Sequence, residues 1–236
     1  MLLKWNLPSL AVLAFGAFLT LAWSYSCLSF AGYLRTKIAL RTGYTRKIFH
    51  ALIFLSAVIA HALGGFVGVC VFGTMVSLVV GLAVLRGPGD RQYAALAREQ
   101  DGAARTYYIV ISYFATMIGG LASNILFGPL AVVGYLVGGL GDAAGEPAGT
   151  RWGRHRYSSR ASGAKTFEGS IAVLIASVVA LLIAVAITPE LHFDLRSAIA
   201  LPLIAVVCTL VEAFSPRGWD NVPMQVVPTL LVAFLL

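Results

Sequence analysis

Between two apolar segments, the chain reads GLGDAAGEPAGTRWGRHRYSSRASGAKTFEGS at residues 139–170. This stretch holds carboxylates near its start and end, several glycines, and arginine, histidine and lysine between them. It stands out because the chain as a whole is 59% hydrophobic and only 11% charged. Soluble domains carry about 25% charged residues. The composition therefore indicates an integral membrane protein, and the polar stretch is the first place to look for chemistry.

A transmembrane helix needs roughly 20 apolar residues. Eight candidate segments occur, at residues 7–33, 47–63, 65–85, 106–123, 125–141, 168–188, 197–214 and 222–236. Several of them are short, and the last contains prolines. We therefore predict an all-α, polytopic integral membrane protein with seven or eight transmembrane helices, forming a single transmembrane catalytic domain over residues 1–236.

The distribution of cations predicts the orientation. If eight spans alternate, one side receives 15 of the 17 Lys and Arg residues, in loops 34–47, 86–105, 142–167 and 215–221. Cytoplasmic loops carry the excess of Lys and Arg, so we expect these loops, and any site built from them, to be cytoplasmic. The net charge of +7 then reflects topology and attraction to anionic lipid headgroups, and nucleic acid is not expected as a partner.

The second segment begins with TRKIFH, in which Arg46, Lys47 and His50 have the spacing of one helical face. Such a cationic face suits an anionic ligand. A simpler alternative is that Arg46 and Lys47 only mark a cytoplasmic flank and that His50 caps a helix.

Asp142 and Glu146 are the first carboxylates of the quoted stretch. Asp142 follows a predicted helix, whose C-terminal dipole end disfavours a negative charge, and the nearby glycines and Pro147 predict a break in the helix. Irregular backbone near membrane depth is tolerated where it lines a polar cavity. Two carboxylates in such a cavity suit Mg²⁺, which is usually held by one or two carboxylates together with phosphate oxygens.

Arg151, Arg154, His155 and Arg156 follow these carboxylates. Guanidinium groups match the geometry of phosphate oxygens, and a carboxylate, a metal, a phosphate and arginines are what phosphoryl or nucleotidyl transfer requires. The alternative is a solvated loop whose arginines only set the topology.

The stretch ends in GAKTFEGS, which is not a P-loop because the glycine and lysine are not adjacent and no strand is expected before them. We expect Thr166 to cap the next helix, with Glu168 in its first turn. That helix N-terminus, where Gly169 leaves the backbone open, is also suited to an anion.

A third polar place is VEAFSPRGWDNVP, residues 211–223. Glu212 lies near the cytoplasmic end of the seventh segment, and an ionisable residue inside a span indicates a functional site. Asp220 and Asn221 begin the last segment, where they could form only a turn and a helix start.

Four motifs occur in order along the chain, RKIFH, GDAAGEPAGTRWGRHRY, KTFEGS and EAFSPRGWDNVP. Together they resemble the CTP-dependent lipid kinase family that includes dolichol kinase, phytol kinase and yeast-type diacylglycerol kinase, over about residues 41–228. The resemblance implies transfer of the γ-phosphoryl group of CTP to the hydroxyl of a membrane isoprenoid alcohol (polyprenol, dolichol or phytol type) or of diacylglycerol.

Residue chemistry and resemblance together give a set of expected roles. The expected catalytic residues are Asp142, Lys165 and His50. The expected ligands of Mg²⁺ are Asp142, Glu146 and Glu168. The expected nucleotide-binding residues are Arg46, Lys47, Gly141, Arg151, Arg154, His155, Thr166, Gly169, Ser170, Asp220 and Asn221.

Other functions stay open at this point. A CTP-dependent lipid cytidylyltransferase of the phosphatidate type would attack the α-phosphorus of CTP, but its late Asp-rich His-Gly-Gly signature is missing from the sequence. A non-enzymatic membrane transporter or scaffold would depend on neither CTP nor Mg²⁺. The sequence also leaves open which lipid alcohol is used and which oligomeric state is formed.

Overall fold

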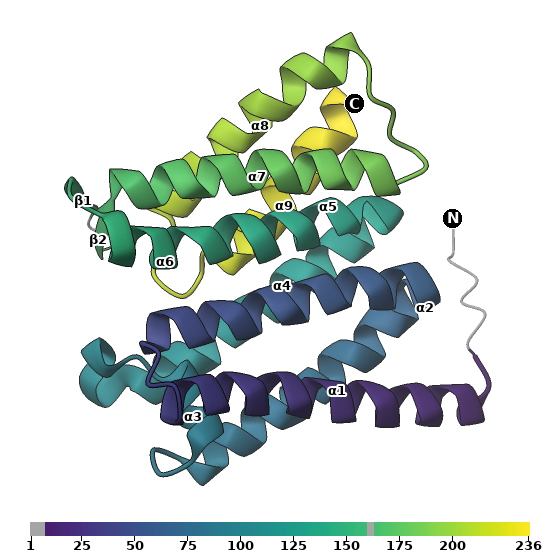
Figure 1. Ribbon diagram of the computed structural model, residues 1–236. Coiled ribbons are helices and arrows are strands. Elements are labelled where there is room, and N and C mark those ends of the chain that lie inside the picture. Colours follow the sequence, from purple (N-terminus) through teal and green to yellow (C-terminus); the bar gives the residue numbers. More distant parts are fainter. Residues whose placement is uncertain (1–7, 160–162) are drawn as a thin grey trace.

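The computed structural model describes residues 8–159 and 163–236, and these residues are mostly helical (Figure 1). The elements run in the order α1 (Leu10–Thr36), α2 (Thr42–Arg86), α3 (Arg91–Leu96), η1 (Glu99–Ala104), α4 (Arg105–Phe127), η2 (Gly128–Leu130), α5 (Ala131–Leu136), η3 (Val137–Gly141), α6 (Asp142–Trp152), β1 (Arg156–Ser159), β2 (Gly163–Thr166), α7 (Phe167–Ile187), α8 (Leu195–Phe214) and α9 (Asn221–Leu235). The predicted all-α class is confirmed, apart from the short antiparallel hairpin of β1 and β2.

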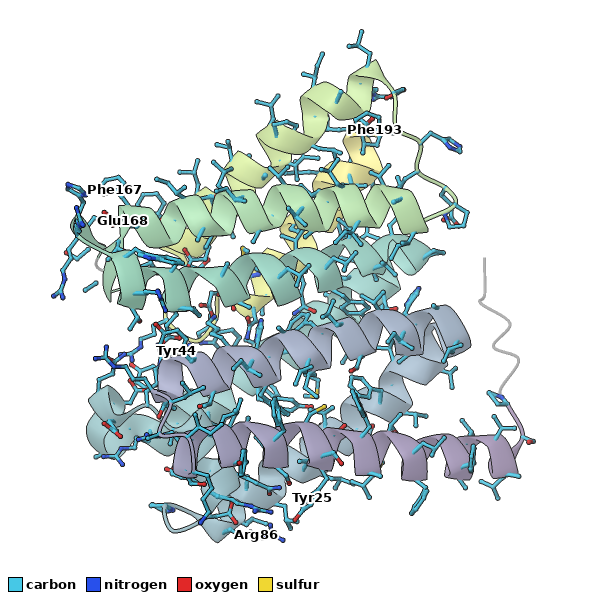
Figure 2. The ribbon with its side chains drawn as sticks, in the orientation of Figure 1. Tyr25, Tyr44, Arg86, Phe167, Glu168 and Phe193 are labelled. Atoms are coloured by element: carbon cyan, nitrogen blue, oxygen red, sulfur yellow. The ribbon has the colours of Figure 1, made fainter. Side chains whose placement is uncertain are left out.

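Long apolar helices dominate the structure. In the part of the chain that is described, five helical stretches are long and apolar enough to cross a membrane, namely Leu10–Thr36, Thr42–Arg86, Glu99–Trp152, Phe167–Ile187 and Leu195–Phe214. Large apolar side chains on their outer faces are exposed, including Phe15, Ile175 and Leu203, and side chains project outward along the helices in Figure 2. Exposed apolar surface of this extent is typical of contact with lipid.

All eight predicted apolar segments overlap helical segments of the described chain. The second and third segments form two arms of α2, which turns at Gly65 with φ 55° and ψ −144°. Glycine adopts a positive φ at little cost because it has no Cβ. The helical segments run back and forth between the same two ends of the bundle (Figure 1). The start of α2, the end of α6 and the hairpin lie together at the left end in this view.

The helix does not break at Asp142, contrary to the expectation from the glycines and Pro147. Instead, α6 continues to Trp152. Its glycines recur every fourth residue and face α7, where a Cβ on Gly145 would lie 2.9 Å from Val173 Cγ2 and one on Gly149 would lie 2.7 Å from Thr166 Oγ1. Small residues with this spacing allow membrane helices to pack closely, and this packing offsets the low helix propensity of glycine.

The π-helical turn η3 explains how one helical run packs against α9 before the turn and against α7 after it. A π-helical turn contains an extra residue and changes which face of the helix points to a given neighbour. Before the turn, a Cβ on Gly134 would clash with the main chain of α9 at Gln225. After the turn, a Cβ on Gly141 would lie 2.6 Å from Ser177 Oγ on α7. Asp142 therefore lies within a helical run, and not beyond the end of a helix as expected from the sequence.

The close contact of α5 with α9 can be tested with Gly134→Ala. The added Cβ must push the Gln225 main chain away, and overpacking of this kind costs about 1–3 kcal/mol. We expect a lower melting temperature in detergent. The control is Gly81→Ala in the second arm of α2, where no atom lies within 4 Å of the added Cβ and alanine is the better helix former by up to about 1 kcal/mol. Equal melting temperatures for the two variants would contradict the close packing.

Candidate functional site

A polar cavity and an apolar cavity adjoin each other at the end of the bundle that carries the motifs. The polar cavity, of about 610 Å³, lies between the ends of α2, α6, α7 and α8 and the hairpin. The apolar cavity, of about 80 Å³, lies mainly between α2 and α4. Both cavities are lined by Arg46, Lys47, Asp142 and Asp220. A ligand in one cavity would therefore meet a ligand in the other at these shared residues.

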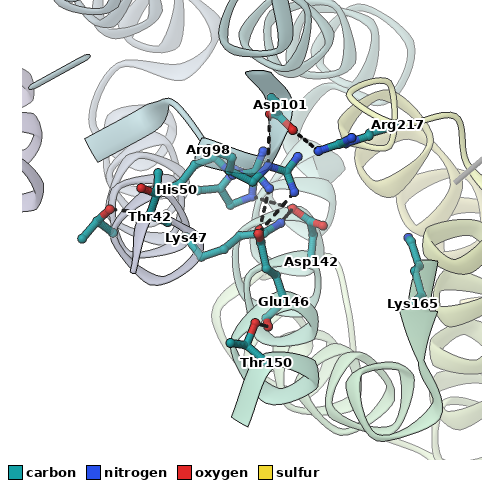
Figure 3. Close-up of polar contacts among 12 residues, drawn as sticks. Thr42, Lys47, His50, Arg98, Asp101, Asp142, Glu146, Thr150, Lys165 and Arg217 are labelled. Atoms are coloured by element: carbon teal, nitrogen blue, oxygen red, sulfur yellow. Dashed lines mark hydrogen bonds and ion pairs between the residues drawn. The ribbon is translucent and has the colours of Figure 1, made fainter. Parts of the chain in front are cut away.

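A buried ion pair lies at this junction. Lys47 Nζ donates to Asp142 Oδ2 at 2.6 Å, and the two side chains are only 9% and 3% exposed (Figure 3). The pair joins the first turns of α2 to the residue that follows η3. No hydrogen bond to Asp142 Oδ1 is formed within the described residues, so this oxygen is free to bind a ligand.

His50 lies beside the same carboxylate. Its Nε2 lies 2.9 Å from the carbonyl oxygen of Gly138 and 3.3 Å from Asp142 Oδ2. A carbonyl oxygen can only accept, so we assign the ring hydrogen to Nε2, which leaves the Nδ1 lone pair of the neutral ring as an acceptor. His50 lines the apolar cavity. The sequence thus correctly predicted that Arg46, Lys47 and His50 share a face, and that face points to α6.

Glu146 binds cations one turn beyond Asp142. Its Oε2 accepts from Arg46 Nη2 at 2.7 Å. Its Oε1 accepts from Arg98 Nη1 at 3.2 Å (Figure 3). Arg98 and Arg217 both form ion pairs with Asp101. Because both oxygens of Glu146 are bound by guanidinium groups, this carboxylate fixes arginines around the cavity and is poorly suited to bind a metal ion.

Asp220 differs from the other carboxylates of the site. It lines both cavities, and its side chain forms no hydrogen bond or ion pair within residues 8–159 and 163–236. Burial raises its pKa, and the nearby charge of Asp142 raises it further. The neighbouring Asn221 is bound instead to α4, where Nδ2 donates to Ser112 O at 3.1 Å and to Thr116 Oγ1 at 2.8 Å. Asn221 lines only the apolar cavity, so the structure gives no support for its expected contact with nucleotide.

The start of α7 forms another wall of the polar cavity. Thr166 Oγ1 accepts from Gly169 N at 3.1 Å, which confirms the predicted helix cap. Thr166, Gly169 and Ser170 all line the cavity. Lys165 lines it as well, and its Nζ donates to Glu212 Oε1 on α8 at 2.6 Å. This wall offers an anion a lysine and the dipole of a helix N-terminus, although the backbone N–H groups of Gly169 and Phe167 are already bound, to Thr166 Oγ1 and to His155 O.

The structure leaves other predicted residues outside the polar cavity. Gly141 packs against α7, and Arg151 and Arg154 are exposed. His155 Nδ1 lies 2.8 Å from Glu168 Oε1, and Glu168 lies at the outer edge of the hairpin end in Figure 2. Glu168 therefore connects the hairpin to α7 and does not join Asp142 in a metal site.

Sequence reasoning missed several residues of the polar cavity, namely Arg41, Arg98 and Arg217, whereas Arg156, which it grouped with Arg151 and Arg154, does line the cavity. Each belongs to one of the cation-rich loops, but nothing in the sequence separates them from Arg151 or Arg154. In the described chain, the cavity is lined by seven Lys or Arg and four Asp or Glu residues. Its volume lies in the range of small-molecule sites, about 300–1,000 Å³. The excess of cations suits a ligand with several negative charges.

A divalent cation has a suitable but incomplete set of protein ligands. Within the described residues, no group of three His, Cys, Asp or Glu side chains could hold a metal ion. Asp142 and Asp220, however, line the same junction. Two carboxylates are sufficient for Mg²⁺ when phosphate oxygens complete the shell. These two residues fit that role because Asp142 keeps Oδ1 free and Asp220 is unpaired in the described chain, whereas both oxygens of Glu146 and both of Glu168 accept hydrogen bonds from protein groups.

Comparison with known proteins gave no match to a family model, to a curated protein or to a solved structure. What the protein does must therefore be inferred from the chemistry of the site.

The two shared carboxylates should respond oppositely to neutralisation. The raised pKa of Asp220 means that its ionisation destabilises the fold at neutral pH, so Asp220→Asn should raise the melting temperature there. This gain should shrink as the pH falls toward the ordinary value of about 3.9. Asp142→Asn should lower the melting temperature, because removing one partner of a buried ion pair costs about 3–5 kcal/mol.

Thermal unfolding in metal-free detergent buffer, at several pH values from acidic to neutral, measures both effects. Destabilisation by Asp220→Asn at neutral pH would show that Asp220 has a stabilising partner and would contradict this description of the junction.

Proposed function

We propose that the protein is a CTP-dependent lipid kinase that transfers the γ-phosphoryl group of CTP to the hydroxyl of a membrane isoprenoid alcohol or of diacylglycerol. The observation that carries this proposal is the junction of a cationic cavity with an apolar cavity at Arg46, Lys47, Asp142 and Asp220. A lipid kinase must bring together a polyanionic nucleotide and an apolar substrate, and this junction allows the two to meet.

The polar cavity supports binding of the triphosphate. Its lining has more cations than carboxylates, and Thr166, Gly169 and Ser170 at the N-terminus of α7 belong to it. Backbone N–H groups and the dipole of a helix N-terminus favour phosphate, and Lys165 adds a full positive charge at the same wall. The choice of CTP rests on the resemblance of the sequence motifs.

The apolar cavity supports binding of the lipid end that carries the hydroxyl. Phe49, Ile53, Val76 and Ile109 are among its lining residues. When an aliphatic chain packs against these side chains, each Å² of apolar surface that it buries contributes about 25 cal/mol of favourable free energy. The hydroxyl can then be oriented toward the carboxylates and His50.

The proposed reaction forms a bond between the lipid oxygen and the γ-phosphorus. The bond between that phosphorus and its bridging oxygen breaks, and CDP leaves with the electron pair. The hydroxyl proton passes to Nδ1 of His50, and the resulting imidazolium is stabilised by Asp142, whose Oδ2 lies 3.3 Å from Nε2. Asp142 and Asp220 would hold Mg²⁺, whose charge offsets that of the phosphates.

The proposal includes seven or eight membrane spans and a site at the cytoplasmic face. The cation-rich loops support this orientation, because cytoplasmic loops carry the excess of Lys and Arg. The start of α2, the end of α6 and the hairpin, which bear many of these cations, lie at one end of the bundle (Figure 1). A cytoplasmic position would give the site access to cellular nucleotide.

Labelled nucleotides test the reaction directly. Purified protein is incubated with γ-labelled or α-labelled CTP, Mg²⁺ and a mixed lipid extract. We expect label in lipid only from γ-labelled CTP, and none without Mg²⁺. Transfer from α-labelled CTP would instead identify a cytidylyltransferase, and no transfer from either nucleotide would favour a transporter or scaffold.

Neighbouring arginines provide a matched test of the nucleotide cavity. Both arginines are exposed, but Arg156 lines the cavity and Arg154 does not. Hydrogen bonds to charged groups contribute about 1.5–3 kcal/mol, so Arg156→Gln should raise KM for CTP roughly 10-fold or more. Arg154→Gln removes the same charge from the same loop and should leave KM nearly unchanged. Equal effects in steady-state kinetics would indicate a general electrostatic role for the loop.

Lys165 should act on turnover. Loss of one charge-stabilising donor costs about 2.7–4 kcal/mol in comparable sites, so Lys165→Met should reduce turnover roughly 100-fold or more. Lys165→Arg should recover part of it, because a planar guanidinium does not reproduce a compact ammonium group.

A control is needed because Lys165→Met also leaves Glu212 without its partner. The double variant Lys165→Met/Glu212→Gln removes the unpaired carboxylate, and we expect it to recover thermal stability but not turnover. Recovery of turnover in the double variant would show that Lys165 has only a structural role.

A further inference from the structure

Two arginines of the polar cavity share one buried carboxylate. Arg98, just before η1, and Arg217, in the loop between α8 and α9, both line the cavity. Asp101 lies between them (Figure 3). Its Oδ1 accepts from Arg217 Nη2, and its Oδ2 lies 3.5 Å from Arg98 Nε. The Asp101 side chain is only 2% exposed and does not line the cavity, so a ligand there would contact the arginines and not Asp101.

Further contacts hold both guanidinium groups in place. Arg98 Nη1 donates to Glu146 Oε1 at 3.2 Å, and the Arg217 guanidinium lies over the Tyr108 ring, 4.5 Å from its centre. A guanidinium has five N–H donors in a planar fork, and these contacts use only some of them. Within the described residues, Arg98 Nη2 and Arg217 Nη1 form no hydrogen bond, and neither is among the fully buried atoms without a partner. Both nitrogens therefore have accessible surface at which a ligand oxygen can accept.

The charges of this group favour an anion. Burial lowers the pKa of Arg98, and the nearby charges of Arg46 and Arg217 lower it further. Because arginine stays protonated in proteins, this crowding raises the free energy of the charged side chains, and an anion bound to them would lower it. Long side chains from separate loops also lose rotamer freedom when they converge on one ligand. A shared carboxylate outside the cavity fixes them beforehand and leaves their free donors for the ligand.

We propose that Asp101 positions Arg98 and Arg217 as a clamp for the terminal phosphates of the nucleotide. Guanidinium forks match the geometry of phosphate oxygens. Arg98 is linked through Glu146 to Arg46, which lines both cavities, so the clamp lies next to the junction where the γ-phosphate is expected. This inference rests on the proposed lipid kinase function and names the groups that hold its phosphate donor.

Asp101→Asn tests the clamp, with Glu99→Gln as the matched control. Asparagine turns an N–H donor toward one of the two guanidinium groups, which can only donate, so that arginine loses its partner. Glu99 belongs to the same η1 but pairs with Arg35, and neither of these lines the cavity. In titrations of the full chain in metal-free detergent buffer, we expect Asp101→Asn to weaken binding of inorganic triphosphate roughly 10-fold and Glu99→Gln to leave it unchanged. Removal of a negative charge alone would instead strengthen anion binding.

Steady-state kinetics separates positioning from a general defect in folding. Asp101→Asn should raise KM for CTP by a similar factor and leave KM for geranylgeraniol unchanged. If Asp101→Asn does not fold, Arg217→Lys and Arg35→Lys provide the same comparison. Lysine keeps the charge and can pair with the carboxylate, but it lacks the planar fork that binds carboxylate and phosphate together. We expect only Arg217→Lys to weaken triphosphate binding.

The clamp and the reaction can fail separately. If Asp101→Asn weakens triphosphate binding but the wild-type protein transfers no phosphoryl group to lipid, the clamp stands and the kinase proposal fails. If the wild-type protein is active but Asp101→Asn binds triphosphate as tightly as Glu99→Gln, or Arg217→Lys as tightly as Arg35→Lys, the clamp is refuted. It is also refuted if the wild-type protein does not bind triphosphate.

Discussion

The buried ion pair between Lys47 and Asp142 is the constraint on which the site depends. Desolvation costs several kcal/mol per buried ion, and attraction between the charges offsets this only with good geometry and further hydrogen bonds. Lys47, near the start of α2, must therefore lie directly against the residue after η3. Once α2 and α6 are fixed in this way, Arg46 reaches Glu146 and His50 reaches Gly138. The pair also lies where the polar and apolar cavities meet.

Close helix packing makes this arrangement possible. The glycines of α6 bring it against α7, and the π-helical turn before them redirects the helix from α9 toward α7. The carboxylates of α6 are then left facing the cations of α2 and of the loop around Arg98. Asp220, next to the anchored Asn221, lines the same junction from the segment between α8 and α9. Packing and charge thus act together to form a junction with one unpaired carboxylate.

Several of these features could be predicted from the sequence, because they depend on local pattern. Apolar length predicts the helices, spacing predicts the shared face of Arg46, Lys47 and His50, and the Thr166 cap follows from its neighbours. The continuity of α6 could not be predicted, since glycine and proline disfavour a helix and only tertiary packing overrides that preference. The path of the hairpin and loops decides which arginines line the cavity and which lie outside it. Both groups come from the same cation-rich loops, so the sequence does not separate them.

The central claim is that nucleotide phosphate and lipid hydroxyl meet at Lys47 and Asp142. The most direct test is an experimental structure of the protein with Mg²⁺, a CTP analogue whose β–γ bridge cannot be cleaved, and a long-chain prenol. We expect the triphosphate in the polar cavity along the start of α7, its γ-phosphate at the junction, and the prenol hydroxyl in the apolar cavity facing that phosphate. A triphosphate bound at the exposed arginines of the hairpin end, or a prenol hydroxyl far from the γ-phosphate, would contradict the account.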